Sequence, residues 1–133
     1  MARFARRNGT WYILNSRTGA VRYETFGGAS FNDVLVPADY DGDVSLDIAV
    51  FRPGTPCLWY IMESTTGTLR TEYWGAPNDV PSQADFDGDG KIDPTIWRPS
   101  DGNWWIIKST GGTVAHTWGA SGDVPVHSAY NRF

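Results

Sequence analysis

The chain has 133 residues, the length of one ordinary domain, and a formal net charge of −4. Its single cysteine excludes an internal disulfide framework, and no apolar run is long enough to predict a transmembrane helix. No secretory signal is recognised at the start, and no dense basic stretch follows the N-terminal arginines. We therefore expect neither insertion into a membrane nor binding to nucleic acid.

Three segments of the chain align with one another, and each contains a tryptophan-bearing strand. The aligned residues Trp11, Trp59 and Trp104 lie 48 and then 45 residues apart. A turn rich in Ser, Thr and Gly follows each segment, and an alternating stretch then ends in an aromatic residue and glycine. This period is typical of a four-stranded propeller blade. The sequence predicts an all-β protein, a β-propeller with three blades in one domain, 1–133, and repeat units at about 1–38, 39–84 and 85–130.

Each unit is expected to contain four short strands and no helix, because no segment shows helical periodicity. The first strand follows an Asp-Val pair, the second precedes the tryptophan segment, the third contains the tryptophan, and the fourth ends at the aromatic-glycine pair. In that order, the expected strands are 34–40, 80–86 and 124–130; 2–5, 47–52 and 93–98; 11–13, 59–61 and 104–106; and 20–26, 68–74 and 113–118.

Two acidic loops with the same spacing occur at 39–47 and 85–93, with aspartate at positions 1, 3, 5 and 9 of nine residues. Four like charges this close repel one another, and a loop that holds them together needs a cation. Calcium fits best, because it accepts several oxygen ligands in irregular geometry. A solvated acidic turn that binds nothing is the alternative, and two copies with identical spacing argue against it.

Both loops resemble the first half of an EF-hand loop, in which position 7 offers its backbone carbonyl and glycine at position 6 allows a sharp turn. Ser45 and Lys91 occupy position 7, and Gly90 occupies position 6 of the second loop. Position 12 carries a bidentate glutamate in an EF-hand, but it is Val50 or Ile96 here. Because strand-like residues follow in place of a helix, we expect calcium loops between strands.

The repeat resembles the FG-GAP family, the integrin-type (VCBS-like) calcium-binding β-propeller repeat. The resemblance rests on Phe26-Gly27, on Trp74-Gly75-Ala76-Pro77, and on an aspartate loop followed by a strand. It implies two calcium ions per chain, and Val44, which replaces the position-6 glycine of the first loop, predicts a weaker first site. The residues implied as calcium ligands are Asp39, Asp41, Asp43, Ser45 and Asp47 in one loop and Asp85, Asp87, Asp89, Lys91 and Asp93 in the other.

The expected strands make three blades, but one blade is divided between strand 2–5 and strand 124–130. Known propellers have about four to eight blades. We therefore expect strand 124–130 to complete the N-terminal blade of a neighbouring chain, which makes a six-bladed dimer the first expectation and a trimer the second. This junction should carry no calcium, because Ala129 and Asn131 replace two ligands.

The resemblance implies a non-catalytic module, extracellular or on the cell surface, for adhesion or lectin-like binding of a glycan or a protein. One alternative is a self-assembling structural fragment or engineered propeller with no ligand of its own. Another is a calcium-dependent polysaccharide lyase. We expect no enzyme, because His116 and His127 share no motif spacing and no nucleophile elbow occurs.

Two further sets of equivalent residues are expected to be structural. The three aligned tryptophans should fill the core between blades rather than bind sugar. Asp33, Asp79 and Asp123 should accept hydrogen bonds from backbone amides in the turn before each first strand. Cys57 has no surroundings in the sequence that mark a nucleophile.

Overall fold

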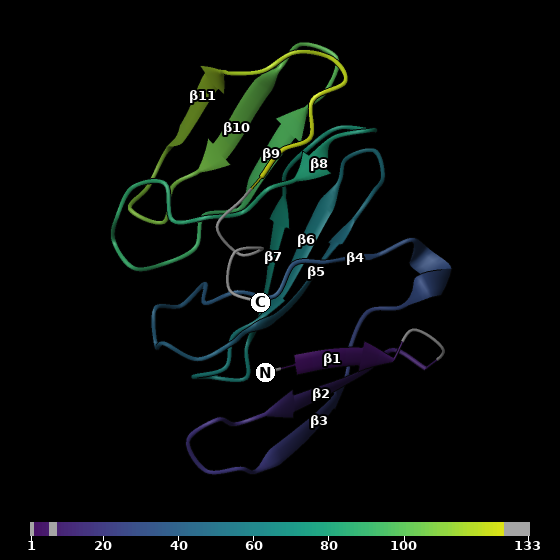
Figure 1. Cartoon of the computed structure of the whole chain (residues 1–133), viewed down its shortest axis with the longest axis vertical. Coiled ribbons are helices and arrows are strands. Elements are labelled where there is room, and N and C mark those ends of the chain that lie inside the picture. The colour runs from purple at the N-terminus through teal and green to yellow at the C-terminus, as the bar shows by residue number, and fades with distance from the viewer. Residues whose placement is uncertain (1, 6–7, 127–133) are drawn as a thin grey trace. The chain divides into compact units, whose positions relative to one another are not determined.

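The computed structural model describes residues 2–5 and 8–126 (Figure 1). These residues form three antiparallel sheets and one short 3-10 turn, η1 (Ala29–Phe31), which confirms the all-β prediction. The chain divides into two compact units, Met1–Asp33 and Val34–Phe133. The first unit contains one sheet and the second contains two. Within the described ranges, no helix has the length and apolar character that crossing a membrane requires.

The sheet of the first unit has three strands in the order β1 (Ala2–Ala5), β2 (Thr10–Leu14) and β3 (Val21–Thr25). Its anchor is Trp11, which is 1% exposed and donates its indole N–H to the carbonyl of Phe26 at 2.9 Å. β3 is exposed along its whole length, and Trp11 is the large side chain buried in this unit among those whose burial the structure describes.

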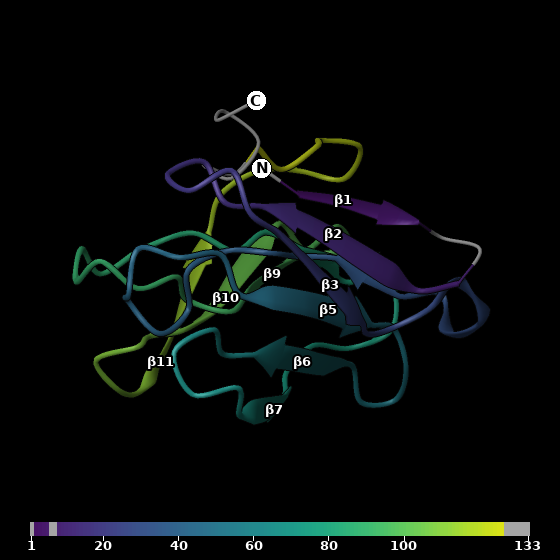
Figure 2. The same cartoon turned by 90° about the horizontal axis from the view of Figure 1, so that it is seen from below.

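The second unit has two four-stranded sheets, and in each sheet every strand pairs with its neighbours in chain order. Within this unit, Figures 1 and 2 show β5, β6 and β7 following one another as adjacent strands. The strands are β4 (Val34–Leu35), β5 (Ile48–Arg52), β6 (Leu58–Met62) and β7 (Leu69–Tyr73) in one sheet, and β8 (Val80–Pro81), β9 (Thr95–Arg98), β10 (Asn103–Ile107) and β11 (Thr113–Thr117) in the other.

Most of the hydrophobic core belongs to the β4–β7 sheet, and Ile96 of β9 joins it. The apolar run of β5 is buried at four successive positions, as expected for a strand covered on both faces. Trp59 is fully buried and meets the ring of Phe51 edge-on at 5.2 Å between centroids. The two sheets are also joined by a hydrogen bond of 3.0 Å from the indole N–H of Trp74 to the carbonyl of Trp105.

The core role expected for the aligned tryptophans is confirmed for Trp11 and Trp59, which are 1% and 0% exposed. Trp104 is only partly buried, and the ring that it contacts, Phe86, is itself 45% exposed. All three indoles nevertheless donate to the carbonyl of the aromatic residue in the aromatic-glycine pair, at distances of 2.8 to 3.0 Å. The recurring tryptophan therefore ties the third strand of each sheet to the end of the fourth.

The role expected for the equivalent aspartates is confirmed. Asp33, Asp79 and Asp123 each accept a hydrogen bond from a backbone amide of the preceding turn, at 3.0, 2.7 and 2.8 Å. Asp79 also receives two hydrogen bonds of 2.9 Å from Arg98, whose planar guanidinium matches a carboxylate. These carboxylates fix the direction in which the chain leaves each turn.

The first strand of each sheet is shorter than the sequence predicted. The expected strands 34–40 and 80–86 are reduced to β4 and β8, and after each of them one isolated bridge forms, Ala38 with Asp47 and Ala84 with Asp93. Val36 and Ala38 still donate their N–H groups to the carbonyls of Ala49 and Asp47, at 3.0 and 3.3 Å, so hydrogen bonding continues past β4 although the regular ladder ends there. Of the expected strand 124–130, residues 124–126 carry no strand pairing, and residues 127–130 lie outside the described residues.

Candidate metal centres

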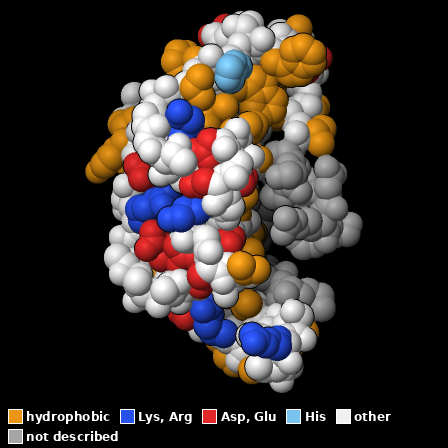
Figure 3. All heavy atoms as spheres, turned by 90° about the vertical axis from the view of Figure 1, so that its left-hand side faces the viewer, with side chains coloured by type: hydrophobic (Ala, Val, Ile, Leu, Met, Phe, Trp, Pro, Cys, Tyr) orange, Lys and Arg blue, Asp and Glu red, His pale blue; other side chains and the backbone are white. Residues whose placement is uncertain are grey.

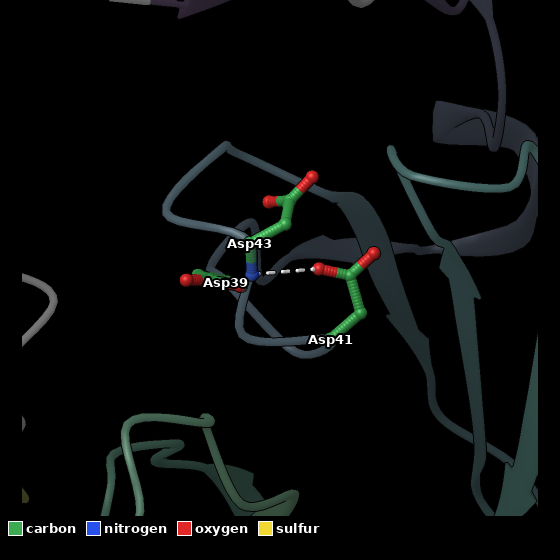
Figure 4. Close-up of side chains that lie close together, drawn as sticks. All are labelled: Asp39, Asp41 and Asp43. Carbon is green, nitrogen blue, oxygen red and sulfur yellow. Dashed lines mark hydrogen bonds between the residues drawn. The ribbon is translucent and has the colours of Figure 1, made fainter.

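Each acidic loop brings three of its carboxylates together. The loops connect β4 to β5 and β8 to β9, and they gather Asp39, Asp41 and Asp43 in one cluster and the equivalent trio in the other. In each cluster, one oxygen from every carboxylate lies within 4.8 Å of the others, a separation that one metal ion could span. Figure 4 shows the first cluster. The members of the second cluster are Asp85, Asp87 and Asp89.

The position-1 aspartate organises each loop before any ion binds. Asp39 accepts N–H groups from Gly42 at 2.6 Å and from Val44 at 2.8 Å, so it holds the chain in a tight turn. Asp85 does the same with Gly88 and Gly90, at 2.6 and 2.9 Å. Both position-6 residues have positive φ, +68° for Val44 and +89° for Gly90. Only glycine adopts this conformation without strain, so the first loop contains a strained residue that the second lacks.

The position-9 aspartates lie outside both clusters. Asp47 is 0% exposed, and its two oxygens accept the N–H of Tyr40 and the N–H of Ser64, both at 2.7 Å. Asp93 is equally buried, and it accepts hydrogen bonds from the N–H groups of Phe86 and Ser109 at 2.8 and 2.7 Å. Burial raises the pKa of Asp47, while these amide hydrogen bonds oppose the shift. Each of these two carboxylates thus joins its loop to the turn that follows the third strand through hydrogen bonds, which we call the staple role.

The turn that follows each third strand supplies hydroxyl groups that the sequence analysis did not include in the site. Asp43 accepts the hydroxyls of Ser64 and Thr65 at 2.9 and 2.7 Å. In the second loop the hydroxyl of Ser109 donates to Asp89 at 2.6 Å, and that of Thr110 donates to Asp87 at 2.6 Å. A Ser-Thr pair opens the turn in both sheets that carry an acidic loop, whereas Ser16 is followed by arginine in the unit without one. The Ser-Thr pair, present only where an acidic loop is present, could have indicated from the sequence that these hydroxyl groups belong to the site.

These hydroxyls favour the ionised form of the carboxylates. The hydrogen bond from Thr65 is the largest effect that lowers the pKa of Asp43. The hydrogen bond from Thr110 lowers the pKa of Asp87 in the same way. In each cluster at least one carboxylate is therefore held in the ionised form by a neighbouring hydroxyl group.

Two observations show that the second cluster fits a hard cation. All of its donor atoms are oxygens, which magnesium and calcium prefer. In addition, Oδ1 of Asp87 is shielded from solvent, and among the residues that the structure describes no donor reaches it with good hydrogen-bond geometry. The matching oxygen of Asp41 accepts the N–H of Asp43 at 3.1 Å. A buried carboxylate oxygen without a partner is costly, and a cation in the cluster would remove that cost.

The predicted carbonyl ligands are held beside the clusters. Ser45 donates its N–H to Oδ1 of Asp43 at 2.7 Å, and Lys91 donates its N–H to Oδ1 of Asp89 at 2.9 Å. These bonds fix the backbone at position 7 next to the position-5 carboxylate. Coordination by the two carbonyls stays a prediction.

The two loops also support each other. The N–H of Ile92, just after position 7 of the second loop, donates to the carbonyl of Asp39 at 2.9 Å. The aliphatic part of Lys91 lies over Gly42, where an added Cβ would come 3.1 Å from Cγ of the lysine. On the face drawn in Figure 3, acidic side chains gather in two groups with basic side chains between them. The acidic charge is thus concentrated rather than spread over that face.

Comparisons with known proteins gave no match: no family model matches the chain, and none was found among curated proteins or among solved structures. The resemblance to the FG-GAP repeat therefore stays a prediction from the motifs. Function is inferred from the geometry of the two clusters.

Proposed function

We propose that each acidic loop binds one calcium ion and that the chain is a non-catalytic, calcium-stabilised β-propeller module. The observation that carries the proposal is the convergence of three carboxylates in each loop, together with the solvent-shielded oxygen of Asp87 that no donor among the described residues reaches with good hydrogen-bond geometry. Calcium is favoured over magnesium because it tolerates irregular geometry, whereas magnesium demands an octahedron. Zinc is disfavoured because neither cluster contains His or Cys.

Each ion would tie together one end of a four-stranded sheet, β4–β7 or β8–β11. Its ligands lie on the loop between the first and second strands, and the same carboxylates are hydrogen-bonded to the turn between the third and fourth strands. Binding there holds all four strands in register. An ion that binds only the folded state stabilises it by about 2.7 kcal/mol per site at a hundredfold excess over the dissociation constant.

The propeller arrangement is supported by three sheets whose neighbouring strands follow chain order. In the proposal each sheet is a blade, and a second copy of the chain supplies the remaining blades of a six-bladed ring, with a trimer as the second arrangement. Six lies within the range of about four to eight blades in known propellers. Such rings present loops to a partner, and we propose an extracellular glycan or protein as the ligand.

An extracellular setting agrees with the exposure of the clusters. Modules that bind calcium outside cells work with dissociation constants of about 10⁻⁴–10⁻³ M. A partly exposed site with a small number of ligands is sufficient for such weak binding. A non-catalytic role is supported by the hydrogen bonds that the carboxylates already accept from the backbone. The position-1 and position-9 aspartates accept hydrogen bonds from backbone N–H groups. Because their oxygens are engaged in this way, they are poorly placed to take a proton from a substrate.

Thermal melting with and without calcium tests the proposal. Chelation should lower the melting temperature of the protein, and added calcium should restore it. Asp87→Ala should remove more than half of the calcium-dependent shift, because the site that is lost is the one expected to bind more tightly. Glu24→Gln is the matched control, since this exposed carboxylate lies on β3 outside both clusters. If chelation and calcium leave the melting temperature unchanged, the proposal is wrong.

A further inference from the structure

One short segment of the chain has the sequence of a first strand but no pairing. Val126 follows Asp123-Val124-Pro125 as Val36 follows Asp33 and Ser82 follows Asp79. Val36 and Ser82 are 2% and 0% exposed, whereas Val126 is 71% exposed. Val124 is also 81% exposed. The segment Asp123–Val126 therefore displays apolar side chains at positions that are buried or paired in the two complete sheets.

The conformation of this segment is already fixed at its start. Oδ2 of Asp123 accepts the N–H of Ala120 at 2.8 Å, as Asp79 accepts that of Ala76 at 2.7 Å. The turn before the segment is thus closed in the same way as the turn before β8. Because the turn is already ordered, docking of the segment costs less conformational entropy.

Among the residues that the structure describes, one edge of β1 has no neighbouring strand. In the two complete sheets the second strand, β5 or β9, pairs on both sides. Over residues 2–5 and 8–126, β1 pairs only with β2, so its other edge has backbone groups without a ladder partner. Exposed strand edges attract additional strands, and peptides recognised in this way bind through main-chain hydrogen bonds.

The two complete sheets define the register that such a strand would take. Phe4 pairs with Trp11 as Trp97 pairs with Trp104, so Phe4 and Trp97 are equivalent. In the complete sheet Val80 pairs with Trp97, which places Val124 opposite Phe4.

The hydrogen bonds of the complete sheets extend this register by two residues. Ser82 donates its N–H to the carbonyl of Thr95 at 2.8 Å, and Val36 donates to that of Ala49 at 3.0 Å. The residue of β1 equivalent to Thr95 and Ala49 is Ala2. The N–H of Val126 would therefore donate to the carbonyl of Ala2.

We propose that Asp123–Val126 of one copy docks as the fourth strand on the free edge of β1 of a second copy, with Val124 opposite Phe4 and Val126 opposite Ala2. The inference rests on the proposed two-copy ring and names the surfaces that join it. The second copy is favoured over an unrelated partner, because this chain makes the same pairing twice, between β4 and β5 and between β8 and β9. It is favoured over β1 of the same chain, because a closed ring of three blades would fall below the range of about four to eight blades in known propellers.

A disulfide across the junction tests the register. Opposed residues of an antiparallel ladder have Cα atoms about 4.5–5.5 Å apart, which a disulfide can bridge. In a Cys57→Ser background, Ala2→Cys with Val126→Cys should shift the main band on a non-reducing gel from one chain to two chains. The control is Ala2→Cys with Pro125→Cys, which is displaced by one residue and points to the other face of the sheet.

The outcomes separate the inference from the proposals beneath it. A covalent dimer formed only by the in-register pair supports the inference. A disulfide within one chain, or a protein that is dimeric by light scattering but gives no in-register link, overturns it. A monomer without any link overturns both the inference and the two-copy ring. Calcium-dependent melting of the same sample is measured separately, so the metal proposal stands or fails by itself.

Discussion

Replacing Val44 by glycine should stabilise the protein. Val44 has φ +68° and is 93% exposed, so its side chain gives little packing in return for its strained backbone. A left-handed conformation costs a non-glycine residue about 1–2 kcal/mol. The greater flexibility of glycine in the unfolded chain offsets about 0.5–1 kcal/mol of that gain. Val44→Gly should therefore raise the free energy of unfolding by up to roughly 1.5 kcal/mol.

The assay is urea denaturation in a chelating buffer, so that strain is measured without metal binding. The midpoint should rise while the dependence of the free energy on urea stays the same. The chain offers a matched control in the second loop, because Gly90 occupies the same position with φ +89°. Gly90→Val should lower the midpoint by a similar amount. If Val44→Gly is no more stable than the original protein, or Gly90→Val is no less stable, the strain argument is refuted.

In chelating buffer, Asp47→Ala should lower the free energy of unfolding by about 2–4 kcal/mol, because two buried or partly buried amides lose their acceptor, while Asp43→Ala should be nearly neutral. Equal stability of these two variants would contradict the staple role. Cys57 should react with Ellman's reagent much more slowly in the native than in the unfolded protein, because burial raises the pKa of its thiol. The stability gained from keeping this thiol neutral should be complete below pH 9.0 and fall as the pH rises further. Arg98→Ala should cost about 1–3 kcal/mol in urea denaturation, because Asp79, whose side chain is 1% exposed, loses its guanidinium partner.

The all-β class and the convergence of the loop aspartates could be predicted from local pattern. Alternate residues of a tight loop point to one side, so aspartates at positions 1, 3 and 5 meet wherever the loop is placed. The strands Ile48–Arg52 and Thr95–Arg98 followed from short apolar runs closed by proline. These features depend on residues close together in the chain.

The role of Asp47 could not be predicted in the same way. Its carboxylate accepts the N–H of Ser64, which lies 17 residues further along and comes near only because β5 pairs with β6. The hydroxyl of Thr65 reaches Asp43 for the same reason. Whether an aspartate at the end of a loop binds an ion or holds a neighbouring turn is decided by that pairing, and not by its spacing in the sequence.

Calorimetric titration of the metal-free protein with calcium tests the central claim most directly. Two ions should bind per chain, one for each carboxylate cluster, and the second loop should bind more tightly because Gly90 turns without the strain of Val44. Asp41→Ala and Asp87→Ala should each reduce the count to one, and each should leave the other site intact. A titration without binding heat at millimolar calcium, confirmed by the absence of calcium after equilibrium dialysis, would contradict the claim that these loops are metal sites.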